Sequence, residues 1–404
     1  MISFYNNLSK NFKNIFYLSS SNLIQSFISF FANLILIYIL SPKNFGEYAI
    51  ITAAFSIIFL IFSLRTETLI IKEKTFDNQK KNQIEILAGW EIIIGFTISL
   101  ILLFYAKFDY LLSSIVIFNL IFQKILNFKR AYVEREMKYS YLSIAELFGL
   151  TISQLIAILL AISNFGSATL FLRDSINILI TYFLILFFFK NNKFRIKFFK
   201  KNNILNIFNK IKYIYLDQLS SDIIFRMLII IGNFYFTNSQ IGYLYQARRL
   251  AIFPAQIISP FINRFCFNFF SRSNYEISVK FFYKSFLFIF LYHLFVYLVI
   301  FFIIEKLITY VYGNEWAQIS TIIILIYLFF VSMSFKSLIR SFIYPLNKDY
   351  LMVISQFLEI ILFACFIIIL DIFGLLSFNI YVLAFSLSAF ISLLYLLLKK
   401  PNRV

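Results

Sequence analysis

The chain has 404 residues, of which 61% are hydrophobic and 14% are charged, and its mean hydropathy is +0.83. A soluble fold of this length would expose far more charge, so the composition excludes a soluble protein and indicates an integral membrane protein. The net charge of +18 would suggest nucleic-acid binding in a soluble protein. Here the basic residues lie between apolar segments, as the positive-inside rule predicts, and we expect no nucleic-acid partner.

Twelve apolar segments are long enough to span a membrane as helices, which takes about 20 residues each. In chain order the predicted helices cover residues 15–40, 48–71, 84–106, 108–128, 141–162, 169–189, 213–236, 243–264, 281–304, 319–340, 351–371 and 376–398. These segments do not alternate polar and apolar residues at a period of two, which argues against strands. The predicted fold class is therefore an all-α integral membrane protein with twelve transmembrane helices.

Lysine and arginine are distributed unevenly between the two sides of the membrane. With the N-terminus inside, the inner segments hold 29 basic residues, Lys124 and Lys336 among them, and the outer segments hold three. This bias predicts that both termini are cytoplasmic. The longest predicted outer connection covers residues 305–318, so we expect no extracellular domain.

The longest predicted inner segment, residues 190–212, places aromatic and aliphatic residues at helical spacing among lysines. This pattern is typical of an amphipathic segment on the anionic lipids of the inner leaflet. It falls between the sixth and seventh helices. We therefore predict an N-lobe of helices 1–6 over residues 1–189, this linker, and a C-lobe of helices 7–12 over residues 213–404.

A short internal similarity supports two related lobes. "SPKNFGEYAI" follows the first helix and "TNSQIGYLYQ" follows the seventh, and their shared apolar–glycine pairs lie 196 positions apart. Both halves begin on the inner side, so the repeat would be parallel, with its axis along the membrane normal. The predicted arrangement is two pseudo-symmetric six-helix lobes around a central cleft.

The seventh predicted helix carries a polar stripe. Gln218, Asp222, Arg226 and Asn233 lie on one helix face. A charge at the membrane centre costs about 2.5–3.5 kcal/mol, whereas each Ile, Leu or Phe returns only about 0.3–0.6 kcal/mol. Such a stripe is expected to avoid lipid. It serves either hydrogen-bonded helix packing or a water-filled cleft between the lobes, and the two charges favour the cleft.

The first predicted helix carries an uncharged stripe of the same kind, made of Asn22, Gln25, Ser26, Ser29 and Asn33. The offset of 196 positions aligns Asn22 with Gln218 and Ser26 with Asp222. We therefore expect Asn22 and Ser26 to line the same cleft as the polar residues of the seventh helix.

Four further charges lie toward the ends of predicted helices, and two of them have two open interpretations. Arg65 and Glu67 are predicted toward the inner end of the second helix, where they either line the cleft or extend to the interface. Arg248 and Arg249 fall in the outer third of the eighth helix. At most one of these two arginines can face lipid comfortably, because they are adjacent on the helix.

Three titratable residues lie deeper in predicted helices. Glu359 and His293 fall near the centres of the eleventh and ninth helices, and Glu91 lies about two turns into the third. Each residue either couples transport to an ion gradient or packs inside the protein with its hydrogen bonds satisfied. Both alternatives stay open. Arg173 and Asp174, at the outer start of the sixth helix, are predicted interfacial anchors.

No pattern in the sequence predicts catalysis. The two cysteines lie far apart, the chain has a single histidine, and no Gly-rich phosphate loop or Ser/His/Asp set is present. We therefore expect no enzyme activity, no metal site and no cofactor.

Three stretches resemble a known family. They are "LSPKNFGEYAIITAAFSIIFLIFSLRTETLI", "DIIFRMLIIIGNFYFTNSQIGYLYQARRLAIFPAQIISPFINRFCFNFFSR" and "VYGNEWAQISTIIILIYLFF". On these stretches the chain resembles the Wzx-type oligosaccharide flippases, the polysaccharide-biosynthesis branch of the multidrug/oligosaccharidyl-lipid/polysaccharide (MOP) exporter superfamily. The resemblance implies two lobes around a partly cationic cleft. The charged positions that match are Arg65, Glu67, Asp222, Arg226 and Arg249.

The resemblance also implies a function. The chain would move an oligosaccharide on a polyprenyl diphosphate, such as an O-antigen or capsule repeat unit, across the bacterial cytoplasmic membrane by alternating access. Arg226 would attract the diphosphate. Expected partners are this substrate, anionic lipids, a proton or sodium counter-ion and a polysaccharide polymerase.

Two alternatives remain. A membrane glycosyltransferase or polysaccharide polymerase would need a larger outer loop than this chain offers. A drug or cation exporter of the same superfamily would need an acidic or aromatic cleft rather than several arginines.

Overall fold

The computed structural model describes residues 21, 24–64, 66–67, 70, 78–105, 108–136, 138–189, 204–272, 274–346, 348 and 350–399. Over these ranges the chain is almost entirely helical and contains no strand. Nine helices of this described part are long and apolar enough to cross a membrane, and a shorter apolar helix covers Ile24–Ile39. The predicted all-α membrane fold is confirmed.

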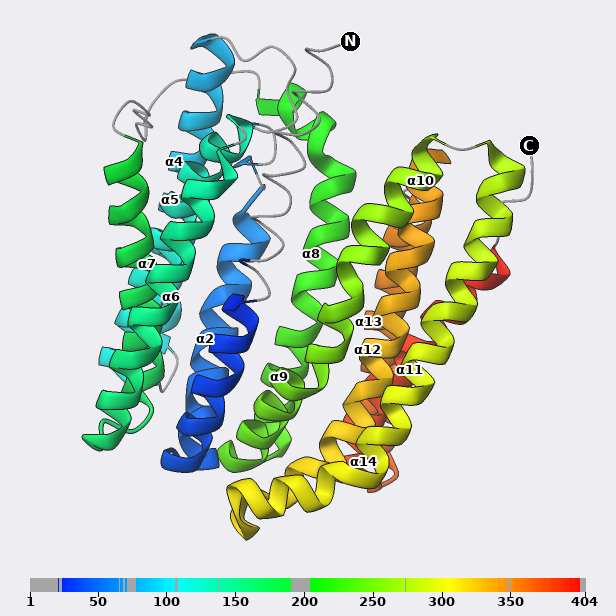
Figure 1. Ribbon diagram of the computed structural model, residues 1–404. Helices are drawn as coiled ribbons and strands as arrows, with labels where there is room; N and C mark the ends of the chain where they lie inside the picture. Colours follow the sequence, from blue (N-terminus) through cyan, green and yellow to red (C-terminus); the bar gives the residue numbers. More distant parts are fainter. Residues whose placement is uncertain are drawn as a thin grey trace. The chain divides into compact units, whose positions relative to one another are not determined.

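Each of the twelve predicted segments is occupied by a helix within the described residues (Figure 1). After the helix Ile24–Ile39 come α2 (Pro42–Phe62), α4 (Asn78–Tyr105), α5 (Tyr110–Arg135), α6 (Tyr139–Ile162), α7 (Ala168–Phe188), α8 (Ile204–Tyr235), α9 (Asn238–Pro260), α11 (Tyr275–Tyr312), α12 (Gln318–Ile343), α13 (Tyr350–Ile372) and α14 (Phe378–Leu398). A short π-helical segment, Phe261–Cys266, and α10 (Phe267–Arg272) extend α9.

The second helix begins and ends earlier than predicted. Pro42 stands in its first turn, where a fixed φ favours helix and the missing N–H costs nothing. At Ser63 the backbone becomes extended (φ −89°, ψ 103°). The prediction that Glu67 lies toward the inner end of this helix was therefore wrong. Glu67 lies beyond the helix, and Arg65 lies outside the described residues.

The predicted outer loop 305–318 was also too long. Helix α11 continues through an apolar stretch to Tyr312 and ends at Gly313, whose φ of 78° suits a residue without a side chain. A single 3₁₀ turn, Asn314–Trp316, then leads into α12. The connection is a few residues long.

The chain divides into two compact units, Met1–Lys212 and Tyr213–Val404. In the N-terminal unit, α5 is the central helix and packs against α2, α4, α6 and α7. In the C-terminal unit, α12 is central and packs against α9, α11 and α14. Residues 190–203 of the predicted amphipathic linker lie outside the described residues, and residues 204–212 form the first part of α8.

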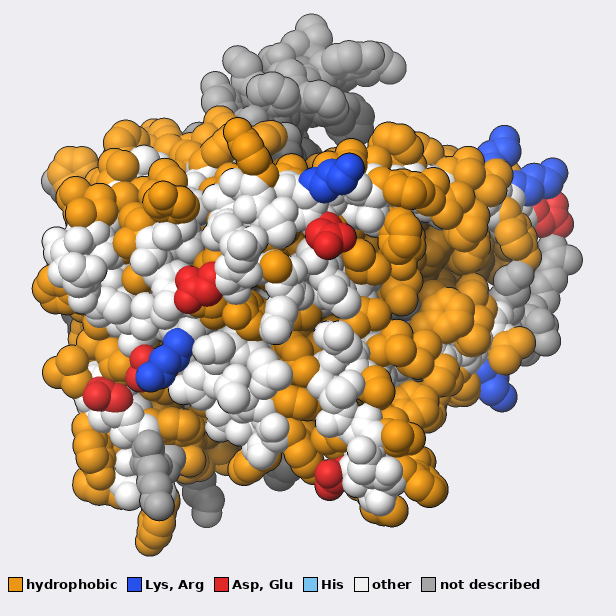
Figure 2. Space-filling model, turned by 90° about the horizontal axis from the view of Figure 1, so that it is seen from below, with side chains coloured by type: hydrophobic (Ala, Val, Ile, Leu, Met, Phe, Trp, Pro, Cys, Tyr) orange, Lys and Arg blue, Asp and Glu red, His pale blue; other side chains and the backbone are white. Residues whose placement is uncertain are grey.

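Large apolar side chains remain exposed on these helices. On α11 they include Phe295, Phe302 and Tyr310, which are 67%, 69% and 92% exposed. Figure 2 shows hydrophobic side chains over much of the visible face, with few charged groups between them. An apolar exterior of this kind matches lipid rather than water.

Candidate substrate-binding site

An arginine cluster is formed by Asp222 and Arg226 of α8 with Arg248 and Arg249 of α9. Arg226 Nη1 donates a hydrogen bond of 2.5 Å to the backbone oxygen of Asp222, one turn earlier. The Arg248 guanidinium lies 3.8 Å from the centre of the Phe225 ring. Arg248 is also close enough to Arg226, Arg249 and Asp222 for each to act on its charge. Three cations and one anion leave the cluster net positive.

The local sequence brings these side chains to one level. A capping box between Thr237 and Gln240 fixes the start of α9, so α8 and α9 form a tight hairpin. Arg226 lies nine residues before the end of α8 at Tyr235, and Arg248 lies ten residues after Asn238. Both distances are about 14–15 Å at 1.5 Å per residue, which is near the middle of a 30 Å hydrocarbon core.

Gly232 allows close packing at the hairpin. A Cβ atom there would lie 2.9 Å from Ile241 Cδ1 and 3.3 Å from the Tyr381 ring, so a larger residue would push α9 and α14 away from α8. The Tyr381 hydroxyl donates a 2.5 Å hydrogen bond to the Leu228 oxygen and ties α14 to α8. These contacts hold α8, which carries Asp222 and Arg226, against α9 and α14.

A second charged group, the α5 lysine cluster, is buried in the N-terminal unit. Lys124 Nζ of α5 lies 2.8 Å from Glu67 Oε2, 2.6 Å from Glu91 Oε2 and 2.7 Å from Ser63 Oγ. Thr66 Oγ1 donates to Glu91 Oε1 at 3.1 Å. Lys124, Glu67 and Glu91 are each less than 10% exposed.

The α5 lysine cluster explains how the chain leaves α2. The backbone at Ser63 and Leu64 is not helical, and such backbone is tolerated inside a membrane protein only where its polar groups are satisfied. Glu91 Oε1 accepts from the Leu64 N–H at 3.2 Å, while Lys124 binds Ser63 and Glu67. Glu91 thus has a structural role in addition to any ion coupling, which stays a prediction.

The C-terminal unit holds a comparable group, the α12 lysine cluster. Lys336 of α12 forms an ion pair with Glu359 of α13, and the two side chains are 3% and 2% exposed. Ser392 of α14 donates to Glu359 Oε2 at 3.3 Å. The central helix of each unit therefore carries a buried lysine paired with glutamate from a neighbouring segment.

The assignment of these two lysines to inner loops was wrong. Lys124 and Lys336 lie within α5 and α12, with carboxylate partners, and contribute nothing to a loop charge bias. Without them the count of inner to outer basic residues is 27 to three, so the predicted orientation keeps its basis.

We expect Lys336→Met and Glu359→Gln each to destabilise the protein by about 3–5 kcal/mol, because each change leaves a buried charged group without its partner. The double variant Lys336→Met/Glu359→Leu should recover most of this loss. The measurement is the folded fraction after heating in detergent. Glu305→Gln and Lys306→Met, at exposed positions of α11, are the controls and should have little effect. If the single and double variants lose the same folded fraction on heating, the pair does not stabilise the fold.

One sequence family and several solved structures are similar to this chain. The sequence profile of the polysaccharide biosynthesis protein family matches residues 35–321, which is more than half of the chain. The chain belongs to this family. No curated protein matches the chain.

Solved structures of MOP transporters share the fold. An inward-facing multidrug resistance MATE transporter of the MOP superfamily is 15% identical, covers 93% of this chain and 94% of its own, and has a TM-score of 0.68. The lipid II flippase MurJ, in an inward closed conformation, is 14% identical over 95% and 87%, with a TM-score of 0.74. A MOP transporter from Pyrococcus furiosus is 13% identical over 96% and 95%, with a TM-score of 0.55.

The profile match confirms the resemblance at the level of the polysaccharide biosynthesis family. The fold is that of the solved MATE transporter and of the lipid II flippase MurJ. At these identities the structural likeness establishes the fold alone.

The remaining predicted site residues differ in what the structure says of them. Asn22 and the Gln218 side chain lie outside the described residues. Ser26 and Asn233 are half-buried on the first helix and on α8. His293 is 2% exposed, and its Nδ1 lies 2.7 Å from the Tyr327 hydroxyl inside the C-terminal unit. Their roles in a cleft or in ion coupling stay predictions.

Proposed function

We propose that this polysaccharide biosynthesis protein is a flippase for oligosaccharides carried on a polyprenyl diphosphate. The observation that carries the proposal is the arginine cluster, which lies nine to ten residues, or about half of a hydrocarbon core, from the α8–α9 turn. Charged groups there are costly and are retained where they serve a substrate path. Planar guanidinium groups suit the oxygens of a diphosphate, which is the one strongly anionic part of such a substrate.

Asp222 has a supporting role in this proposal. One acid among three arginines lowers the cost of holding the cations in a low-dielectric environment while no substrate is bound. An arriving diphosphate then competes for the guanidinium groups. Transport proceeds by alternating access, with the two units moving as bodies. The counter-ion, the anionic lipids and a polymerase partner stay predictions.

The arginine cluster also separates this proposal from the alternatives. A cation exporter would need a negative site, whereas this one is net positive. A glycosyltransferase or polymerase acting outside the membrane would need a sizeable outer domain. The described connections at the ends of α6, α8 and α11 are only turns, over residues 163–167, 236–237 and 313–317.

We place both termini in the cytoplasm. In a variant with Cys266 and Cys365 replaced by serine, single cysteines in 41–47, 237–242 and 313–317 should react with a membrane-impermeant thiol reagent added outside intact cells. Cysteines in 190–212 should react only after the cells are opened. Labelling of 190–212 in intact cells would reverse the orientation.

The proposal is tested by complementation of a bacterial strain that lacks its own oligosaccharide flippase. Expression of the wild-type chain, with matching glycosyltransferases supplied, should restore surface glycan. Failure to restore glycan at a normal membrane level of the protein, with undecaprenyl-linked substrate accumulating inside, would refute the proposal.

A further inference from the structure

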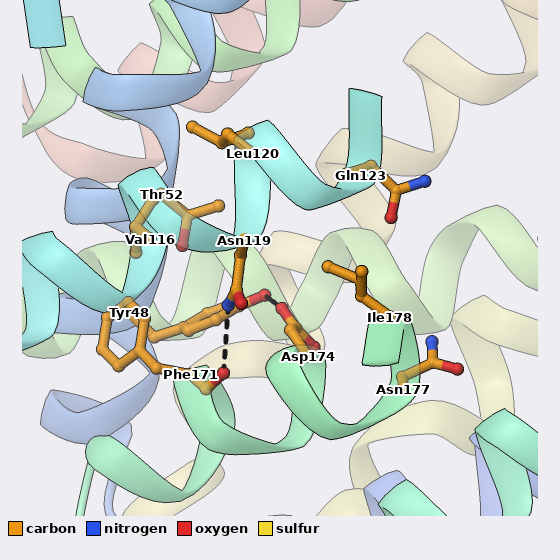
Figure 3. A pocket seen from close by; sticks show the side chains of 10 residues that line it. All are labelled: Tyr48, Thr52, Val116, Asn119, Leu120, Gln123, Phe171, Asp174, Asn177 and Ile178. Carbon is orange, nitrogen blue, oxygen red and sulfur yellow. Dashed lines mark hydrogen bonds between the residues drawn. The ribbon is translucent and has the colours of Figure 1, made fainter. Parts of the chain in front are cut away.

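A pocket with polar and apolar lining lies entirely within the N-terminal unit, between α2, α5 and α7 (Figure 3). Its volume is about 200 Å³. This is smaller than the roughly 300–1,000 Å³ that encloses a drug-sized ligand, so the pocket fits one ring-sized group. The lining residues are Tyr48 and Thr52 of α2, Val116, Asn119, Leu120 and Gln123 of α5, and Phe171, Asp174, Asn177 and Ile178 of α7.

Two polar atoms of the pocket have no partner among the described residues. Asn119 is 9% exposed, and its amide nitrogen donates to the Phe171 oxygen at 3.2 Å, which leaves Asn119 Oδ1 buried without a hydrogen bond. Thr52 Oγ1 is buried without one as well. Buried polar atoms are rarely left this way, because each unmade hydrogen bond is costly. A ligand with hydroxyl groups would satisfy both.

The charge of the pocket is balanced. Asp174 accepts hydrogen bonds from Arg173 Nε at 2.9 Å and Nη2 at 2.8 Å, and the Tyr48 hydroxyl binds its other oxygen. The Asp174 carboxylate is thus neutralised by an arginine of its own helix. A pocket without net charge selects neither a cation nor a phosphate. Of the two predicted interfacial anchors, Asp174 lines the pocket and Arg173 pairs with it.

The pocket combines two kinds of surface. Amide, hydroxyl and carboxylate groups of Asn119, Gln123, Asn177, Thr52 and Asp174 offer hydrogen bonds, and apolar side chains lie between them. In Figure 3, Asn119 of α5 lies beside Tyr48 of α2 and Asp174 of α7, while Gln123 and Asn177 extend to the side. A neutral sugar ring has the matching surface, with hydroxyls at its edge and C–H groups on its faces.

We propose that this pocket binds one neutral sugar ring of the transported oligosaccharide. The inference rests on the proposed function, and it divides recognition between the units: the arginine cluster takes the diphosphate, and the N-terminal unit takes a sugar. A lipid-linked oligosaccharide needs both, because its charged and neutral parts lie several bonds apart.

The test measures binding to the full chain in nanodiscs by saturation-transfer NMR. The probes are glucose, galactose, mannose, rhamnose and N-acetylglucosamine, with pyrophosphate and tetraethylammonium as charged probes. At least one sugar should bind to the wild type. Thr52→Val and Asn119→Leu should each weaken that binding about tenfold, because each removes a buried hydrogen-bonding group.

Thr97→Val is the matched control. Thr97 lies on α4 outside the pocket, with its hydroxyl bonded to backbone oxygens of its own helix, and this variant should bind sugar normally. Arg226→Ala should lose pyrophosphate binding and keep sugar binding, so the two sites fail independently. The inference is overturned if no sugar binds, if both pocket variants bind sugar as the wild type does, or if tetraethylammonium occupies the pocket instead.

Discussion

Replacing Lys124 with methionine is expected to destabilise the protein by about 3–5 kcal/mol, an effect on folding as large as any that we predict. The change removes the shared partner of Glu67 and Glu91, and both carboxylates are almost fully buried. It also frees the backbone segment that follows α2, because Lys124 binds Ser63 there. The measurement is the amount of protein that remains monodisperse in detergent after heating, together with its level in membranes.

Two controls identify the cause of this loss. Adding Glu67→Gln and Glu91→Gln to Lys124→Met should recover much of the stability, because no buried charge then remains unpaired. Lys138→Met changes a lysine whose pair with Glu136 is about half exposed, and such pairs contribute less than about 1 kcal/mol. If Lys124→Met is as stable as Lys138→Met, the α5 lysine cluster does not hold the segment.

Arg226→Ala is expected to abolish or sharply reduce surface glycan in the complemented flippase-null strain, with the protein still present in the membrane. Its guanidinium belongs to the arginine cluster and donates a hydrogen bond to the backbone oxygen of Asp222. Loss of this group removes a planar donor that Lys cannot replace in geometry. Arg226→Lys should therefore give an intermediate defect.

Asp222→Ala should be milder for transport and worse for membrane level, because it leaves the arginines without their acid. Lys306→Ala removes an exposed cation of α11 and should complement fully. Full complementation by Arg226→Ala at normal expression would show that the cluster is structural and that the diphosphate binds elsewhere.

The twelve helices were predictable because a spanning segment must be apolar along its whole length, which is a local property of the sequence. The ends of the helices were less predictable from the sequence. Pro42 at a first turn and Gly313 at a positive φ set two boundaries, and both lie inside or beside apolar stretches that extend past them. Hydropathy alone averages over such single residues.

The site was predictable in part. Spacing on α8 brought Asp222 and Arg226 together, because residues four apart share a helix face. The partners of Lys124 and Lys336 were not predictable, since Glu67 lies 57 positions from Lys124 and Glu359 lies 23 positions from Lys336. Each lysine lies near the inner end of a predicted helix and was counted with the inner basic residues, because its carboxylate partner comes from another segment. The pocket of Thr52 and Asn119 likewise needs helices that are distant in sequence.

Reconstitution of the purified chain in liposomes tests the central claim most directly. A fluorescent polyprenyl-diphosphate oligosaccharide is placed in both leaflets, and a reagent that cannot cross the membrane quenches the outer molecules. With the wild type, quenching should proceed beyond the outer half, and with Arg226→Ala it should stop near one half. Quenching that stops near one half with the wild type as well, in vesicles shown to contain folded protein, would contradict the account.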